Sequence, residues 1–388
     1  MAGPGGLEPP TNGSSWRLTV NRHIRFCTAP GGVRIAYGIA GNGPPIVRAA
    51  HWLTHIEFDG VSPVWRHWFA ELTRQNTLVR YDARGCGLSD RDVDDLSFDA
   101  WVSDLEAVVD SAGIKRFALL GISRGGPVAI AYAARHPERV SHLILYATRT
   151  TGVSVLPRSR QEMDEHEMQI RLAEIGWDRD NPSARQMFAT LLQPDGSSEQ
   201  HRSFVEIMRL ATSGRVAAKL LRVAGQMDVR TAAPLVACPT LVLHARDDAR
   251  VPFEEGRLTA SLIPGARFVP LDGRNHILVE NEPAWAQFVS ELRGFLSEPT
   301  SPSAPPARFV DLSPREVEIL EMIAAGLANR LIAAQLHLSD KTVRNHINRI
   351  FRKLDVQSRA QAIVMARDAG LGGSIGTSSV RPGVPKKA

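Results

Sequence analysis

Three side chains in this sequence have the types and the order needed for nucleophilic chemistry: Ser123, Asp248 and His276. A serine hydroxyl attacks a carbonyl group only weakly until a base removes its proton and an acid orients that base. Each of the three follows a short apolar run that predicts a strand, and ligands bind parallel sheets at the carboxyl ends of the strands. We therefore predict that the three side chains meet at that edge, with the neighbouring Asp247 as the alternative acid.

The serine lies in the segment Gly121 to Gly125, G-I-S-R-G, between the strand-like run RFALL and the helical run GPVAIAYAARHPERV. A turn this tight between a strand and a helix leaves no room for side chains beside the serine, which explains the glycines. The G-x-S-x-G pattern alone is a weak signal, and its strand-turn-helix setting makes it informative. Two interpretations are open for the side chain of Arg124: a packed or ion-paired residue of the turn, or an anchor for a ligand carboxylate.

The candidate acid and base each follow a strand pattern of their own. The run PTLVLHA leads into a loop with Asp247 and Asp248, and the run ARFVPLD leads into a loop with His276. A single aspartate in a loop is usually a cap or turn residue, and a single histidine is usually structural. The ordered set of three, each directly after a strand, favours catalysis over these ordinary roles.

Short apolar runs alternate with helical patterns through most of the chain. The strand patterns are RIAYGIAG, PPIVRAA, NTLVRYD, RFALLGIS, SHLILYA, PTLVLHA and ARFVPLD. Near-continuous apolar strands separated by helices predict a mostly parallel sheet covered on both faces, which is the α/β class. Between Thr150 and Thr231 the strand patterns stop and helical patterns take over, so residues 151–230 are predicted to form a helical lid after the sixth strand.

The predicted lid is rich in methionine. It contains five of the eight methionines of the chain: Met163, Met168, Met187, Met208 and Met227. Two interpretations are open, because flexible thioethers adapt to an apolar ligand and also fill the core between helices.

Residues 22–297 resemble the α/β-hydrolase superfamily, and the motif Y-D-A-R-G-C-G-L-S-D, Tyr81 to Asp90, is similar to the loop after the fourth strand of that family. The resemblance implies an α/β-hydrolase fold with a helical lid. By the same resemblance Ser123 is the nucleophile, Asp248 the acid and His276 the base.

The oxyanion hole implied by this resemblance departs from the family pattern. Its donors would be the backbone N–H groups of Trp52 and Arg124, which bind the negative oxygen of a tetrahedral intermediate. The family usually carries His-Gly after the third strand, whereas this sequence has Ala50-His51. A histidine restricts the backbone more than a glycine does, and loss of one such donor typically costs about 10²-fold or more in rate.

A second unit is predicted after a proline-rich segment. The segment SEPTSPSAPPA, Ser297 to Ala307, combines four prolines with small polar residues and predicts a linker. A capping-box pattern with proline at the first helical position begins at Ser313 and predicts the start of a helix. A second short helix is expected at 329–336 and a third from Ser339, its N-cap. Three short helices with a tight turn indicate a helix-turn-helix.

The third of these helices has an apolar stripe and a polar face. The stripe consists of Val343, Ile347, Ile350 and Leu354. The polar face consists of Lys341, Thr342, Arg344, Asn345, Asn348, Arg349 and Arg352. In the major groove of DNA, Arg and Asn read base edges, while Lys, Thr and Arg bind phosphates. The pattern therefore predicts a recognition helix for double-stranded DNA.

The segment from L-S-P-R-E-V-E-I-L to K-T-V-R-N-H-I-N-R-I-F-R-K-L-D-V-Q-S-R-A-Q-A resembles the LuxR-type helix-turn-helix across all four of its helices. The resemblance implies a homodimer formed through the last helix, Ser358 to Ala369. The residues at base-contact positions are Arg344, Asn345 and Asn348. Those at backbone-contact or supporting positions are Lys341, Thr342 and His346, and Arg349 joins the predicted DNA-binding set.

Charge, cysteine content and hydropathy set bounds on the whole chain. Residues 308–388 hold 13 Lys and Arg against 7 Asp and Glu, whereas the residues before them hold 33 against 34. The basic excess therefore coincides with the predicted DNA-binding unit, although three of its cations lie in the tail. Three scattered cysteines predict neither a disulfide framework nor a metal site, and no apolar run reaches the roughly 20 residues of a membrane span. We expect a cytoplasmic protein without a cofactor or a metal.

The predicted domain order has five parts. They are a disordered leader at 1–21, the α/β-hydrolase domain at 22–297, a proline-rich linker at 298–307, the DNA-binding domain at 308–372 and a disordered tail at 373–388. Three functions compete: a ligand-responsive transcription regulator with a slow or vestigial hydrolase site, a regulator that turns over a signal ester or lactone, and a serine hydrolase with an accessory DNA-binding domain. The domain order favours a regulator that senses a small ester- or lactone-like ligand.

Overall fold

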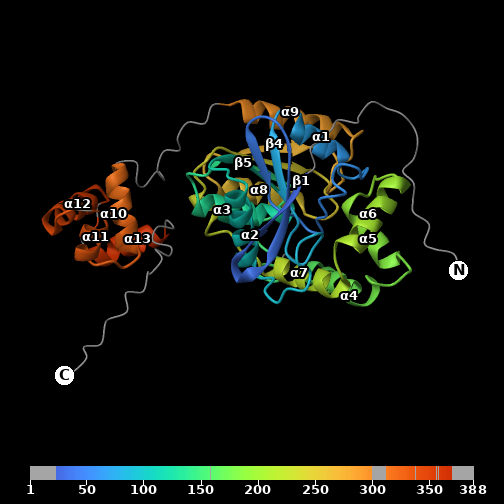
Figure 1. Cartoon of the computed structure of the whole chain (residues 1–388), viewed down its shortest axis with the longest axis horizontal. Coiled ribbons are helices and arrows are strands. Elements are labelled where there is room, and N and C mark those ends of the chain that lie inside the picture. Colours follow the sequence, from blue (N-terminus) through green and yellow to red (C-terminus); the bar gives the residue numbers. More distant parts are fainter. Residues whose placement is uncertain are drawn as a thin grey trace, which may run out of the picture.

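The computed structural model describes residues 23–157, 159–298, 312–336, 338–354, 356 and 358–368. The predicted leader and tail, and the predicted linker apart from Glu298, lie outside the described residues. The described residues form an α/β unit and a helical unit (Figure 1).

An eight-stranded sheet forms the centre of the α/β unit, in the order β1-β2-β4-β3-β5-β6-β7-β8 (Figure 1). Its strands are β1 His23–Thr28, β2 Arg34–Gly41, β3 Pro45–Arg48, β4 Thr77–Tyr81, β5 Phe117–Ile122, β6 Val140–Tyr146, β7 Thr240–Ala245 and β8 Arg267–Leu271. β2 pairs antiparallel with β1 and β4, and every other neighbouring pair is parallel. The α/β class predicted from the sequence is confirmed, and β1 is a strand that the sequence patterns did not indicate.

Helices cover both faces of this sheet. On one face are α1 Arg66–Arg74 and α9 Pro283–Ser297, and on the other are α2 Phe98–Ser111, α3 Gly125–Arg135 and α8 Phe253–Leu262. Successive residues of a strand point to opposite faces, and in β5 Leu119 and Leu120 accordingly belong to different core clusters. This double covering explains why the strands read as continuous apolar runs.

Four helices lie between β6 and β7, in the segment where the strand patterns stop: α4 Arg160–Gly176, α5 Ser183–Leu192, α6 Ser198–Ala211 and α7 Gly214–Gln226. We call them the lid helices. Serine side chains cap three of them by accepting a hydrogen bond from a backbone N–H of the first turn, and these serines are Ser159, Ser197 and Ser213.

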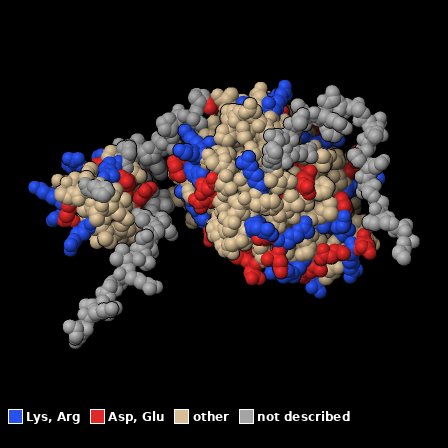
Figure 2. Space-filling model, viewed as in Figure 1, with Lys and Arg blue, Asp and Glu red and all other residues tan. Residues whose placement is uncertain are grey.

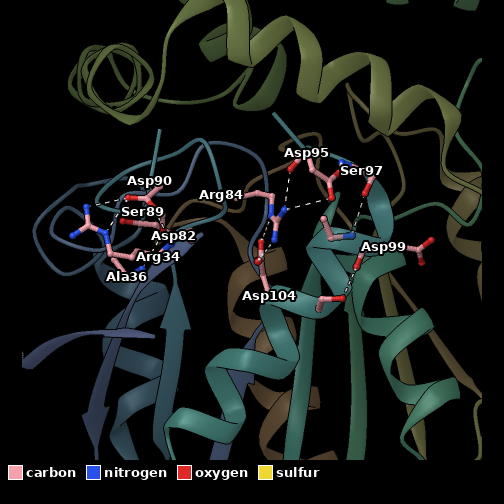
Figure 3. A network of polar contacts seen from close by, with 12 residues as sticks. Arg34, Ala36, Asp82, Arg84, Ser89, Asp90, Asp95, Ser97, Asp99 and Asp104 are labelled. Atoms are coloured by element: carbon pink, nitrogen blue, oxygen red, sulfur yellow. Dashed lines mark hydrogen bonds and ion pairs between the residues drawn. The ribbon is translucent and has the colours of Figure 1, made fainter. Parts of the chain in front are cut away.

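The loop after β4, which carries the motif at Tyr81–Asp90, is fixed by a buried ion pair. Arg84 donates to both carboxylate oxygens of Asp104 on α2, at 2.8 and 2.7 Å, and both side chains are 1% exposed (Figure 3). Arg84 also donates to the backbone carbonyl of Asp95. The same loop contacts the lid, because the hydroxyl of Thr212 donates to the carbonyl of Gly85 at 2.7 Å. The ion pair therefore supports the loop on which the junction of α6 and α7 rests.

The helical unit consists of α10 Pro314–Ala324, α11 Asn329–Gln335, α12 Asp340–Lys353 and α13 Arg359–Asp368. Ser313 and Glu316 form the predicted capping box, and Ser339 caps α12 as predicted. The predicted apolar stripe of α12 is buried in the core of this unit. Among the helices of the described residues, none is long and apolar enough to cross a membrane.

Candidate functional site

Ser123 lies on a strained turn between β5 and α3. Its φ is 51°, in the left-handed region that residues other than glycine rarely adopt, and its N–H donates to the carbonyl of Tyr146 at 2.9 Å. A Cβ on Gly121 would lie 2.7 Å from the Cα of Gly126, so the strand and the helix approach too closely for a side chain there. The turn thus holds the serine hydroxyl at the carboxyl edge of the sheet.

The three candidate catalytic side chains form one continuous chain of hydrogen bonds. His276 Nε2 lies 2.8 Å from Ser123 Oγ, and His276 Nδ1 lies 2.9 and 3.1 Å from the carboxylate oxygens of Asp248. The side chains of His276 and Asp248 are fully buried, whereas Asp247 is exposed. The structure therefore brings Asp248 and not Asp247 against the histidine.

The surroundings of Asp248 favour its ionised form. Burial alone would raise the pKa of this carboxyl, but the neighbouring His276 and the hydrogen bonds to it lower the pKa below the usual range. Asp248 Oδ1 also accepts the backbone N–H groups of Arg250 and Val251, at 2.8 and 2.9 Å. An ionised acid can only accept, so Nδ1 of the histidine carries the proton and Nε2 accepts from the serine hydroxyl.

The loop after β3 carries the second candidate oxyanion donor, Trp52, and is held by side chains on both sides. The His51 ring stacks on Trp65 with ring centroids 4.5 Å apart, and its Nδ1–H donates to the Trp52 carbonyl at 2.8 Å. Burial, with a contribution from Arg48, lowers the pKa of His51 to about 3, so its ring is neutral at pH 7.

Arg124 supports this loop from the other side. Its guanidinium donates to the His51 carbonyl at 3.2 Å and lies 4.6 Å over the Trp101 ring, and the residue is 8% exposed. Burial lowers the pKa of Arg124 to about 10, so it keeps its charge at pH 7. No carboxylate of the described residues pairs with it. Its contacts are therefore those of a packed residue of the turn, the first of the two roles considered for Arg124. Within the same part of the chain, no acceptor is bonded to the backbone N–H groups of Trp52 and Arg124.

Two adjoining cavities open beside Ser123 under the lid helices. They hold about 520 and 430 Å³ of empty space, open solvent at their mouths included, and share Ser123, Arg124, Leu221, Ala224 and Arg250 as lining residues. The smaller cavity adds the apolar side chains Trp52, Phe188 and Leu192. Trp52 also contacts Phe188 with ring centroids 5.2 Å apart, which joins the loop after β3 to the lid.

The lid methionines contribute little to these cavities. Met227 lines the larger cavity, and Met208 is buried in the core. The side chains of the other three are exposed: Met163, Met168 and Met187. A methionine-lined pocket therefore does not describe this site, and core filling describes Met208 and Met227.

Three basic residues of the larger cavity were not predicted from the sequence: Arg149, Arg250 and His166. Arg250 lies two positions after Asp248, and this position on a catalytic loop was a usable signal. His166 lies on α4, far from any motif, and nothing in the sequence around it indicates a place in the cavity.

Helix α12 presents the predicted DNA-contacting side chains on its solvent face. Figure 2 shows Lys and Arg side chains on the surface of the helical unit. Thr342 and His346 are half-buried, and the Thr342 hydroxyl lies 2.8 Å from that of Ser339. Arg344 forms an ion pair with Asp340, one turn earlier, at 2.6 Å. The exposed members of the predicted set are Lys341, Arg344, Asn345, Asn348 and Arg349.

Comparison with known proteins agrees with both units. Residues 58–283 match the alpha/beta hydrolase fold family, and residues 310–366 match the bacterial regulatory proteins of the luxR family. The chain is 25% identical to pyrrolizixenacetamide deacetylase of Xenorhabdus hominickii over 270 residues, which cover 69% of this chain and 96% of the deacetylase. It is also 43% identical to the transcriptional regulatory protein DegU of Brevibacillus brevis over 53 residues. These residues cover 14% of this chain and 22% of DegU. The esterase RhEst1 of Rhodococcus sp. ECU1013 superimposes with a TM-score of 0.60 at 27% identity, over 71% of this chain and 98% of the esterase.

Proposed function

This chain belongs to the alpha/beta hydrolase fold family and ends in a LuxR-type DNA-binding domain, and on that basis we propose that it is a transcription regulator that senses and hydrolyses a small ester or lactone. The observation that carries the proposal is the hydrogen-bonded chain from Ser123 through His276 to Asp248, beside cavities that open under the lid helices. Both cavities border Ser123, so a ligand bound there would lie against the candidate nucleophile.

The proposed reaction has two steps. Ser123 Oγ attacks the ester carbonyl carbon while His276 Nε2 takes the hydroxyl proton, and Asp248 stabilises the resulting imidazolium. The tetrahedral intermediate then expels the alkoxide, which takes the proton from His276 and leaves an acyl group on the serine. Water attacks this acyl group, gives a proton to His276, and collapse of the second intermediate returns that proton to the serine and releases the acid.

The proposed oxyanion hole uses the backbone N–H groups of Trp52 and Arg124. Two observations support it: both N–H groups lack an acceptor among the described residues, and the hydrogen bonds of His51 and Arg124 fix the carbonyls of the same loop. Donors fixed before the reaction stabilise a developing negative charge without a cost of reorganisation.

The proposed DNA contacts follow from the exposed face of α12. Arg344, Asn345 and Asn348 are proposed to read base edges, and Lys341, Thr342, His346 and Arg349 to contact or support contacts with the backbone. We further propose that the chain acts as a homodimer through α13, on which Val364 is 58% exposed. We also propose that it works in the cytoplasm, where bacterial DNA lies.

We expect Arg344→Ala to weaken binding to the preferred DNA sequence by about 1–3 kcal/mol and to relax base preference, because one arginine-to-base contact is lost. The measurement is a selection from randomised duplexes followed by binding titrations with the full-length protein. Lys341→Ala is the matched control, since loss of a phosphate contact weakens all sequences alike. Equal affinity of the wild-type protein for every duplex contradicts sequence-specific binding.

A second candidate function is a serine hydrolase with an accessory DNA-binding domain. The similarity to a deacetylase and an esterase over most of their lengths favours it. The two functions differ in one respect: only the regulator requires the occupied cavity to change DNA affinity.

A further inference from the structure

The larger cavity beside Ser123 is lined by basic side chains and no acidic ones. Arg124 comes from the turn after β5, Arg149 from the segment after β6, Arg250 from the loop after β7 and His166 from lid helix α4. The other residues that line it are apolar, or are small and uncharged. Three arginines and one histidine, from four separate elements, therefore converge on one cavity.

Two of these cations are already engaged. Arg149 forms ion pairs with Glu162 and Glu255, at 2.7 and 3.0 Å. The Arg124 guanidinium donates to the His51 carbonyl and lies over Trp101. Carboxylates therefore neutralise Arg149. Arg124 has no carboxylate partner among the described residues, and its Nη1 is unpartnered, but the His51 carbonyl and the Trp101 ring hold its guanidinium against the loop after β3.

The side chain of Arg250 makes neither kind of contact. Within the described residues no carboxylate lies within ion-pair distance of its guanidinium, and its only hydrogen bond is the one its backbone N–H donates to Asp248. The residue lines both cavities, so its side chain borders the space in which a substrate of Ser123 would lie. Arg250 is half-buried, and without a carboxylate partner its guanidinium N–H groups are available to a ligand in this space.

His166 is unpartnered in the same cavity. Both of its ring nitrogens are buried without a hydrogen-bond partner in the described structure, and the residue is 8% exposed. Burial, with contributions from Arg250 and Arg149, lowers the pKa of His166 to about 4, so the ring is neutral at pH 7 and has one N–H to donate. A buried polar group without a partner is rare in folded proteins and often marks a place for a ligand or water.

We propose that the ester or lactone taken by this site carries a carboxylate, which the guanidinium of Arg250 binds with the imidazole of His166 as a second donor. The inference rests on the proposed function, because it concerns the ligand of the same serine. The apolar part of the ligand occupies the smaller cavity, against Trp52, Phe188 and Leu192. The planar fork of a guanidinium matches the two oxygens of a carboxylate, which makes a carboxylate the favoured anion.

The test compares two esters of equal length on the full-length protein: mono-4-nitrophenyl glutarate and 4-nitrophenyl pentanoate. The glutarate ester ends in a carboxylate, where the pentanoate ester ends in a methyl group. We expect kcat/KM to be at least about 10-fold higher for the glutarate ester, because only it places an anion at Arg250. Arg250→Met should remove this preference by lowering kcat/KM for the glutarate ester about 10–100-fold while the pentanoate ester changes less than about threefold.

Two variants make the result specific. Arg250→Lys keeps the positive charge and should retain part of the preference. Arg246→Met is the matched control, because Arg246 lies in the same loop, is exposed and pairs with Asp272 at 3.0 Å. It should keep the wild-type preference. A wild-type preference for the neutral ester, or an equal loss for both esters in Arg250→Met, overturns the proposal.

A binding arm separates this inference from the proposed hydrolysis. Ser123→Ala protein is titrated by calorimetry with monomethyl glutarate and with methyl pentanoate. Tighter binding of monomethyl glutarate supports the carboxylate site even if the wild-type protein hydrolyses neither ester, and equal or weaker binding overturns it. Hydrolysis of the pentanoate ester without any preference for the carboxylate overturns the carboxylate site and leaves the hydrolase proposal standing.

Discussion

His276→Ala and Ser123→Ala should each lower ester hydrolysis by about 10⁴-fold or more and abolish covalent labelling by an active-site fluorophosphonate. The reason is the connected geometry of the site: Ser123 Oγ has one base within hydrogen-bond distance, the buried Nε2 of His276 at 2.8 Å. Without that base the serine keeps its proton, and without the serine no acyl group forms. The measurements are labelling followed by peptide mapping, and hydrolysis of the esters named above.

The control is Ser261→Ala, which removes an exposed serine hydroxyl on α8 and should leave labelling unchanged. Circular dichroism of each variant establishes that the fold is intact. Labelling of Ser123 that survives the loss of His276 would show that the serine reacts without this base, against the proposed mechanism.

The second large effect concerns stability. Asp104→Ala should lower the free energy of unfolding of the α/β unit by about 3–5 kcal/mol, because it leaves the fully buried cation of Arg84 with only a longer ion pair, at 3.8 Å, to the exposed Asp95. The measurement is denaturant unfolding of the full-length protein followed by tryptophan fluorescence; the six tryptophans of the described residues all lie in the α/β unit.

Two further variants test this cause. Asp99 lies on α2 like Asp104 (Figure 3) and forms an exposed ion pair with Arg135 of α3. Asp99→Ala should therefore cost at most about 1 kcal/mol. The double variant Arg84→Met with Asp104→Leu should recover most of the stability, since apolar replacement of a buried pair is often neutral. If Asp104→Ala has the same free energy of unfolding as Asp99→Ala, the buried ion pair is not required for the stability of the α/β unit.

The sequence predicted well those features whose signal is local. The caps at Ser313 and Ser339 follow from neighbouring residues, and the structure confirms both. The buried strands were also recognised, because strands covered on both faces are continuous apolar runs. β1 was missed because it is an edge strand with one neighbour: its sequence HIRFCT alternates polar and apolar residues, and Phe26 is 56% exposed.

The candidate site was predicted only in part, for a physical reason. Ser123, Asp248 and His276 each follow a strand, so the order of the strands along the chain was sufficient to place them. The cavity depends on how the lid helices pack over the sheet, and this packing has no local sequence signal. Arg250 and His166 come together only through that packing, which is why the composition of the pocket became visible with the structure.

The exposed lid methionines show the same limit. Helical spacing identified which residues belong to helices but not which face of each helix points inward. Met163, Met168 and Met187 lie on outward faces, whereas Met227 follows α7 and borders the cavity. A pattern of residue types therefore predicted the lid without predicting the lining of the pocket.

The most direct test of the regulator proposal is the affinity of the full-length protein for its selected DNA sequence, with and without a fluorophosphonate bound to Ser123. A ligand shifts DNA binding only through a different affinity for two states of the protein, and a coupling of about 1–3 kcal/mol corresponds to roughly 5–150-fold in affinity. Ser123→Ala protein treated with the same reagent is the control, and its affinity should not change. We expect the DNA affinity of the labelled wild-type protein to differ from that of the unlabelled protein by at least about fivefold. Identical DNA-binding curves, for this label and for chemically varied esters, would contradict regulation by the cavity. The chain would then be a hydrolase that is merely tethered to a DNA-binding domain.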